Sequence, residues 1–215
     1  MLRSFISLLF LLTNHSVFSQ TTLRGVAAIS ANHFLRDSIE VSPNKSFNKK
    51  IKIRDISNSK YKIEIRLYTD YSLSNTKSLR RIYLVDTIWK ADAYDEQNNP
   101  VAIKKYKLYG KPSFDSLIIK LLSFNIMSLP NQSELKTKMR KDTVEVVDGE
   151  YIKMNKHIMV TDGESYTVEI KVGKDSRIYG FDNPESYAKF YDNVKELKDY
   201  VNIIRTFNSN LSNSR

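Results

Sequence analysis

The chain has 215 residues, of which 34 are Lys or Arg, 24 are Asp or Glu and none is Cys. Without cysteine it forms no disulfide and carries no acylated cysteine of a lipoprotein, so its stability must come from an ordinary hydrophobic core. Hydrophobic residues make up 41% and aromatic residues 11%, which argues against disorder, and the formal net charge of +10 favours anionic partners.

A short apolar run follows a basic residue at the start of the chain. Arg3 precedes the uninterrupted apolar residues 5–12. This pattern is typical of a secretory signal peptide, because the run is far shorter than the roughly 20 residues of a spanning helix. The small side chains of Val17 and Ser19 predict cleavage between Ser19 and Gln20. We therefore expect a secreted or periplasmic protein that has no transmembrane segment after cleavage and a net charge of +9 once Arg3 is lost.

Alternation of apolar and charged residues begins after an N-terminal segment, residues 20–48, whose structure we leave undecided. From Lys50 to Arg54, and again over residues 60–67, every second side chain is apolar and the intervening ones are mostly basic. A period of two predicts half-buried strands with a solvent-exposed basic face. The alternating charged residues are Lys50, Lys52, Arg54, Lys60, Lys62, Glu64 and Arg66.

Further elements follow in chain order. Strands are expected at 81–89 and 101–109, separated by a polar stretch at 92–100. At residue 113 the apolar spacing becomes helical, with Ser113 as N-cap, which predicts a buried helix over 113–128.

The last third of the chain contains turn signals and a second helix. Asp148-Gly149, Asp162-Gly163 and Gly173 separate apolar runs, which predicts an antiparallel β-meander over 143–181. Asn183 and Pro184 then favour the start of a long helix, residues 184–207, and a frayed tail is expected at 208–215.

These elements define one expected fold class. After the signal peptide, residues 1–19, and the undecided segment, we expect a single α+β domain over residues 49–211, strand-rich at 49–110. Its mainly antiparallel sheet, with the C-terminal β-meander, should be covered by two helices, the last one long and C-terminal.

Residue types for catalysis are scarce. Only two histidines, His33 and His157, follow the signal peptide, and 124 positions separate them. This excludes a zinc site of closely spaced ligands, and no glycine motif for nucleotide phosphates is present. We assign no catalytic residue, no metal site and no cofactor.

The polar stretch at 92–100 is one candidate ligand site. Trp89 and Tyr94 stand near Asp92, Asp95 and Glu96, and an aromatic face beside hydrogen-bonding groups suits a sugar ring. Calcium binding by these oxygens lacks the EF-hand spacing. The alternative is that Trp89 completes the core and the rest is a solvated loop.

Basic residues are the second candidate site. The face formed by Lys50, Lys52, Arg54, Lys62 and Arg66 would attract an anionic polysaccharide or envelope surface, and the alternative is a solvated face that serves solubility. Nucleic acid is not an expected partner of an exported chain. We therefore favour a non-catalytic binding or structural module of the cell envelope or extracellular space. A glycan hydrolase with catalytic carboxylates and an inhibitor or immunity-type protein remain alternatives.

Overall fold

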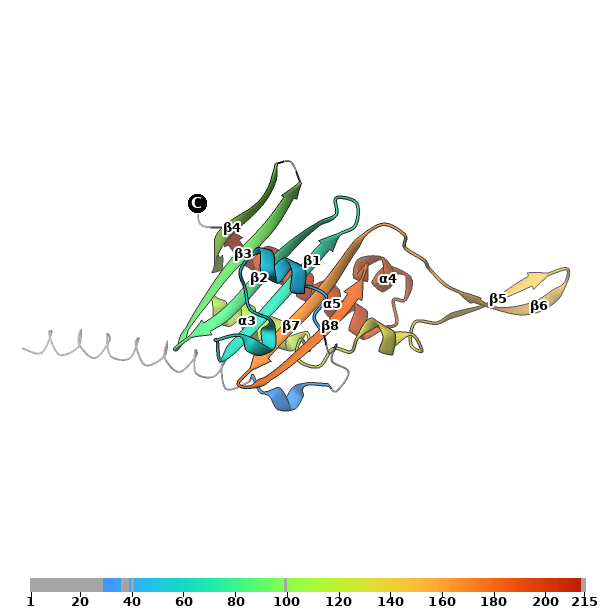
Figure 1. Cartoon of the computed structure of the whole chain (residues 1–215). Helices are drawn as coiled ribbons and strands as arrows, with labels where there is room; N and C mark the ends of the chain where they lie inside the picture. The colour runs from blue at the N-terminus through green and yellow to red at the C-terminus, as the bar shows by residue number, and fades with distance from the viewer. Residues whose placement is uncertain (1–28, 36–38, 40, 99, 214–215) are drawn as a thin grey trace, which may run out of the picture.

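A seven-stranded antiparallel sheet forms the body of the protein (Figure 1). The computed structural model describes residues 29–35, 39, 41–98 and 100–213. The strand order is β8-β7-β1-β2-β3-β4-β9, and every neighbouring pair is antiparallel. The strands are β1 (Ile63–Tyr71), β2 (Thr76–Val85), β3 (Ile88–Asn98), β4 (Val101–Gly110), β7 (Glu164–Val172), β8 (Asp175–Asp182) and β9 (Leu211–Asn213).

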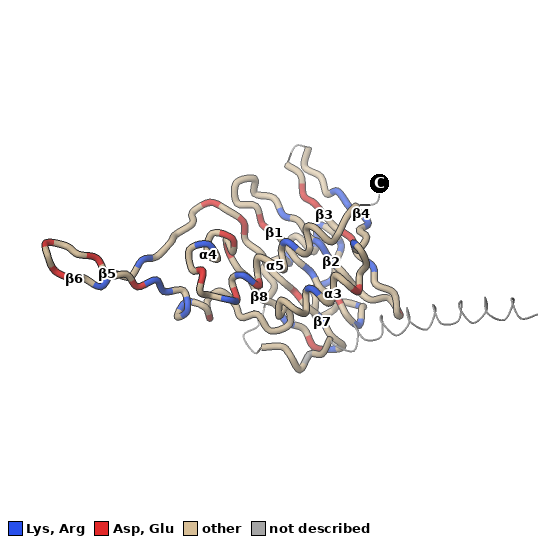
Figure 2. The backbone as a smooth tube through the Cα atoms, turned by 180° about the vertical axis from the view of Figure 1, so that it is seen from behind, with Lys and Arg blue, Asp and Glu red and all other residues tan. Residues whose placement is uncertain are grey.

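Helices cover one face of this sheet and enclose the main core. Figure 2 shows α3 (Phe114–Ser123) and α5 (Lys195–Asn210) in front of the strands, with α4 (Pro184–Phe190) beside them. Ile65 of β1, Leu117 of α3 and Leu197 of α5 belong to the same buried cluster. Because side chains alternate between the faces of a strand, the odd-numbered positions of β1 point into this core.

The opposite face of the sheet is covered by a shorter segment of chain. The helix α2 (Lys45–Lys50) and the 3-10 helix η2 (Ile56–Asn58) lie on it, and Phe47 and Ile51 pack there against Tyr68 and Tyr94. The remaining 3-10 helices are η1 (Ala31–His33) and η3 (Gln132–Leu135). Both faces of the central strands are therefore buried.

A separate hairpin leads away from the body (Figure 1). It consists of β5 (Lys141–Val147) and β6 (Glu150–Lys156), which pair only with each other in a two-stranded sheet. Within the described residues, no helix is both long and apolar enough to cross a membrane.

The expected α+β class is confirmed, with an antiparallel sheet and a long C-terminal helix packed on it. Four expectations for residues 50–128 differ from the structure. Residues 50–54 are not a strand but the end of α2 and the loop after it, and the expected strand at 81–89 contains the turn between β2 and β3. The polar stretch starting at residue 92 mostly continues β3 rather than forming a loop, and α3 ends at Ser123 instead of residue 128.

The second half also needs corrections. The expected meander over 143–181 is two separate hairpins, because residues 157–163 connect the projecting hairpin to β7 in the main sheet. The expected helix at 184–207 is divided into α4 and α5, and α5 continues to Asn210. The tail is not frayed up to residue 213, because β9 pairs with β4. The predicted signal peptide lies outside the described residues.

Candidate functional site

A row of charged side chains crosses the sheet beneath α2. The strand register places Glu169 beside Arg66, Arg66 beside Arg81 and Arg81 beside Asp92, on four adjacent strands. Together with Glu64 of β1 these four residues form what we call the ionic cluster. Arg66 Nη1 lies 3.2 Å from Glu169 Oε2, and Arg81 Nη2 lies 2.8 Å from Asp92 Oδ2.

Glu64 links the two arginines of the ionic cluster. Its Oε1 accepts hydrogen bonds from Arg66 Nε at 2.8 Å and from Arg81 Nη1 at 3.5 Å. Removing two charges from water is costly unless they are paired and hydrogen-bonded, and here every carboxylate faces a guanidinium. Burial lowers the pKa of Arg81, but Asp92 and Glu64 raise it more strongly, so this guanidinium stays protonated.

Burial acts in the opposite direction on Glu169 of the cluster and on the nearby Tyr83. It raises the pKa of Glu169, against the hydrogen bonds from Ser42 and Arg66, which lower it. Burial and the neighbouring Asp92 also raise the pKa of Tyr83 to about 12. Both groups therefore hold their protons more tightly than they would in water.

Three adjoining hollows surround the loop between α2 and β1, above the ionic cluster. The first lies against α2, and the second lies over the cluster and has a volume of about 530 Å³. The third lies beside the turn of β2 and β3. The first and second share Ile53 and Arg54 in their walls, and the second and third share Lys60 and Tyr61. The hollows therefore adjoin one another along one surface.

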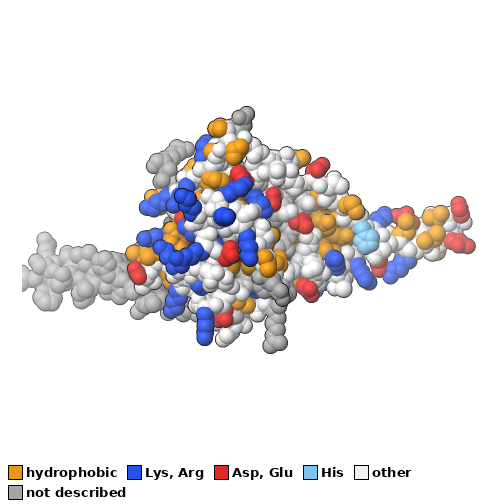
Figure 3. Space-filling view, in the orientation of Figure 1, with side chains coloured by type: hydrophobic (Ala, Val, Ile, Leu, Met, Phe, Trp, Pro, Cys, Tyr) orange, Lys and Arg blue, Asp and Glu red, His pale blue; other side chains and the backbone are white. Residues whose placement is uncertain are grey.

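Exposed cations line all three hollows, and we call this surface the basic track. Figure 3 shows Lys and Arg side chains gathered over α2 and the β3–β4 part of the sheet. In the described part of the chain none of the track cations forms an ion pair with a carboxylate, so their charge is available to a ligand. The track cations are Lys45, Lys49, Lys52, Arg54, Lys60, Lys62, Lys90 and Lys105.

Tyrosine rings form part of the track. Tyr61 and Tyr83 stack with centroids 4.2 Å apart, and both line the third hollow. Lys60 lies over the ring of Tyr61 at 5.4 Å, and Lys105 lies over the ring of Tyr94 at the same distance. The half-buried pair of tyrosines thus places apolar ring surface between cations.

Lys52 adopts an unfavourable backbone conformation at the rim of the second hollow. Its φ is 56°, and its N–H donates to Lys49 O at 3.3 Å just after the end of α2. Glycine is usual at this position of a helix end, since a Cβ destabilises the left-handed conformation. The chain places a lysine there instead.

The predicted basic face is partly preserved in the track, although not as a strand face. Lys52, Arg54 and Lys62 line the hollows. Lys50 instead pairs with Glu96 at 2.7 Å, and Arg66 is buried in the ionic cluster at the base of the second hollow. Arg66 therefore does not lie on a solvent face, because α2 and its following loop cover this side of the sheet.

The predicted sugar platform does not form. Trp89 belongs to the main core under the helices, whereas Tyr94 lies on the opposite face of the sheet with α2, so the sheet separates the two rings. Asp92 is buried against Arg81. Asp95 has a buried carboxylate oxygen without a hydrogen-bond partner, and Glu96 accepts from Lys50 and from the backbone of Lys77.

The candidate binding residues chosen from the sequence did not include Lys45, Lys90 or Lys105. Lys45 and Lys105 stand in basic stretches of the sequence, but only the strand order brings these stretches to one surface. A stacked pair such as Tyr61 and Tyr83 leaves no local signal, since Tyr61 lies in the loop before β1 and Tyr83 lies on β2.

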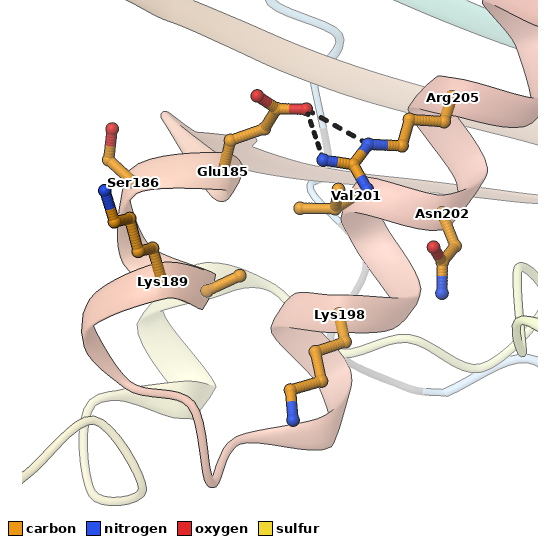
Figure 4. Close-up of a pocket in the computed structure, with 8 residues that line it drawn as sticks. Glu185, Ser186, Lys189, Lys198, Val201, Asn202 and Arg205 are labelled. Atoms are coloured by element: carbon orange, nitrogen blue, oxygen red, sulfur yellow. Dashed lines mark hydrogen bonds and ion pairs between the residues drawn. The ribbon is translucent and has the colours of Figure 1, made fainter.

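A further hollow lies between α4 and α5 (Figure 4). Arg205 there pairs with Glu185 at 3.2 Å, while Lys189 and Lys198 are exposed and form no ion pair with any described carboxylate. This hollow has no aromatic wall. It supplies lysines that match those of the basic track in charge and exposure but not in surroundings.

Neither the search for a metal site nor the comparison with known proteins gives a further indication of function. The described residues contain no group of three or more His, Asp or Glu side chains placed to hold a metal ion. No family model matches the chain, and the comparisons with curated proteins and with solved structures found no match.

Proposed function

We propose that this protein is a binding module whose basic track holds an acidic polysaccharide. The observation that carries the proposal is that three adjoining hollows with shared wall residues bring eight exposed cations to one surface, and none of the eight forms an ion pair with a described carboxylate. A polymer with repeated negative charges can contact several of these cations at once. Each contact is weak in water, but contacts on one chain reinforce one another.

The tyrosines favour a sugar polymer over a simple anion. A sugar ring has an apolar surface and a polar edge, and the stacked Tyr61 and Tyr83 offer apolar ring surface next to Lys60 and Lys62. The predicted signal peptide would bring the protein to the envelope or the extracellular space, where such polymers occur. Mass spectrometry of the mature protein tests that location, because export predicts a chain that begins at Gln20.

Binding to polygalacturonate, with neutral dextran as the control polymer, tests the proposal. We expect affinity for polygalacturonate to fall steeply between low and high salt, since mobile ions screen exposed charges over about 8 Å at physiological ionic strength. The variant Lys60→Glu/Lys105→Glu should bind at least about tenfold more weakly at low salt.

A matched variant separates the track from the overall charge. Lys189→Glu/Lys198→Glu changes the net charge by the same amount in the hollow between α4 and α5. It should retain most of the binding. Equal losses in both variants would show that only net charge matters, and absence of polygalacturonate binding in the wild type would overturn the proposal.

A further inference from the structure

The projecting hairpin exposes apolar side chains that no other described element covers. Val144, Val146 and Tyr151 are 65%, 62% and 83% exposed, and they lie on one face of the two strands. A lone two-stranded hairpin is at best marginally stable in water. Exposed apolar surface on such an element is typical of a contact with another molecule.

The tip of this hairpin is acidic. Residues 142–150 contain Asp142, Glu145, Asp148 and Glu150 and no Lys or Arg, as Figure 2 also shows. Asp142 pairs with Lys153, and Glu145 pairs with Lys156. The two carboxylates at the turn, Asp148 and Glu150, are exposed and form no ion pair with any described cation.

The basic track has the complementary character. The track has tyrosine rings beside cations that form no ion pair with described carboxylates. The tip has Val146 and Tyr151 beside carboxylates that form no ion pair with described cations. In Figure 1 the hairpin extends from the end of the body near β8 and α4, whereas the track lies over α2 and the part of the sheet near β3 and β4. The tip therefore points away from the track of its own chain.

We propose that the hairpin tip of one copy docks into the basic track of a second copy. Asp148 and Glu150 contact track lysines, and Val146 and Tyr151 pack against the tyrosine rings. Such a contact joins two different surfaces, so it is heterologous and continues from copy to copy into rings or open chains. The proposal uses the same track as the proposed function but does not require that the track binds polysaccharide.

Sedimentation velocity of the purified protein tests this contact over protein concentrations from about 1 μM to about 1 mM, a range that covers weak to moderate affinities. At low salt we expect the average mass to rise with concentration, and high salt should reduce it. The tip variant Asp148→Asn/Glu150→Gln and the track variant Lys60→Glu/Lys105→Glu should each remain monomeric. Asn tolerates the left-handed conformation of Asp148, whose φ is 53°, so the turn is retained.

Mixing the two variants gives the decisive result. The track variant still has an intact tip and the tip variant an intact track, so an equimolar mixture should form a dimer and nothing larger. A symmetric contact between two hairpins would not be restored in this mixture. Wild-type protein that stays monomeric, a tip variant that still associates, or a mixture without dimer would overturn the proposal.

Two controls keep the result interpretable. The melting temperature of each variant shows that it is folded, and Lys60→Gln/Lys105→Gln replaces the track variant if charge reversal prevents folding. The tip variant should bind polygalacturonate like the wild type if the proposed function is correct. Wild-type protein that binds the polymer but does not self-associate would show that only the docking proposal fails. Wild-type protein that self-associates but does not bind the polymer would show that only the proposed function fails.

Discussion

Arg66 and Glu169 form an ion pair across β1 and β7, with 3.2 Å between Nη1 and Oε2 and side chains that are 1% and 0% exposed. The same cluster holds a segment that carries four of the eight track cations, Lys45, Lys49, Lys52 and Arg54. Ser42 donates a hydrogen bond to Glu169, and Ser59 donates one to Glu64. The ionic cluster thus ties both ends of the segment 42–59 to the sheet, so its integrity should matter for stability and for ligand binding.

Loss of Arg66 should destabilise the fold strongly. Arg66→Ala leaves Glu64 and Glu169 buried without their shared guanidinium, which should cost about 3–5 kcal/mol of the free energy of unfolding. Urea denaturation measures this change. Arg205→Ala is the control, because Arg205 forms an exposed pair with Glu185 that should contribute only about 0–1 kcal/mol. If Arg66→Ala and Arg205→Ala both changed the free energy of unfolding by the same small amount, the ionic cluster would not be important for stability.

The pH dependence of stability should reveal the protonation of Glu169. Its folded-state pKa lies above that of the unfolded chain, about 4.3, so its contribution to stability is fully present below that value. The contribution is lost as pH rises through the folded-state pKa. Relative to Glu169→Gln, the wild type should therefore become less stable between pH 4 and neutral pH, as melting temperatures of both proteins would show. If the wild type instead became more stable relative to Glu169→Gln as the pH rises, pairing of Glu169 with Arg66 would outweigh its burial.

The C-terminal helix should be a structural support of the sheet. Leu197 of α5 is fully buried in the main core, so Leu197→Ala should lower the free energy of unfolding by about 2–5 kcal/mol. Ile119→Ala on α3 is the control, since this side chain is 55% exposed and its loss should change stability little. Thermal unfolding of both variants checks the difference, and an unchanged melting temperature for Leu197→Ala would show that the helix is not needed for the core.

Lys52 should lower the stability of the fold through its backbone conformation while its charge contributes to ligand binding. Lys52→Gly relieves the left-handed backbone at φ 56° and should raise the free energy of unfolding by about 0.5–1 kcal/mol, while removing one track charge weakens polygalacturonate binding. Lys52→Ala keeps the strained backbone and removes the same charge, so it should lose affinity without gaining stability. Calorimetry and a binding titration measure the two effects. Unchanged affinity in both variants would exclude Lys52 from the site.

Local patterns in the sequence predicted several elements correctly. Alternation identified β4 near residues 101–109, the turn at Asp148-Gly149 joins β5 to β6, and Ser113 caps α3 by accepting from the backbone of Ser116. These features depend on contacts between residues close in sequence. The turn at Asp86 was missed because it contains neither glycine nor proline, although Asp86 has a φ of 55°.

By itself the sequence determined the α+β class, the strands that alternate and the basic character of the chain, because periodicity and composition are local quantities. Alternation separates the two faces of a strand but does not say which face another segment covers, so Arg66 was expected in solvent and is buried. Only the tertiary structure decided that Lys90 and Lys105 join the loop near Lys60 in one track. The reason is that strand order and register, which pair residues as distant as Arg66 and Glu169, depend on long-range packing rather than on any local pattern.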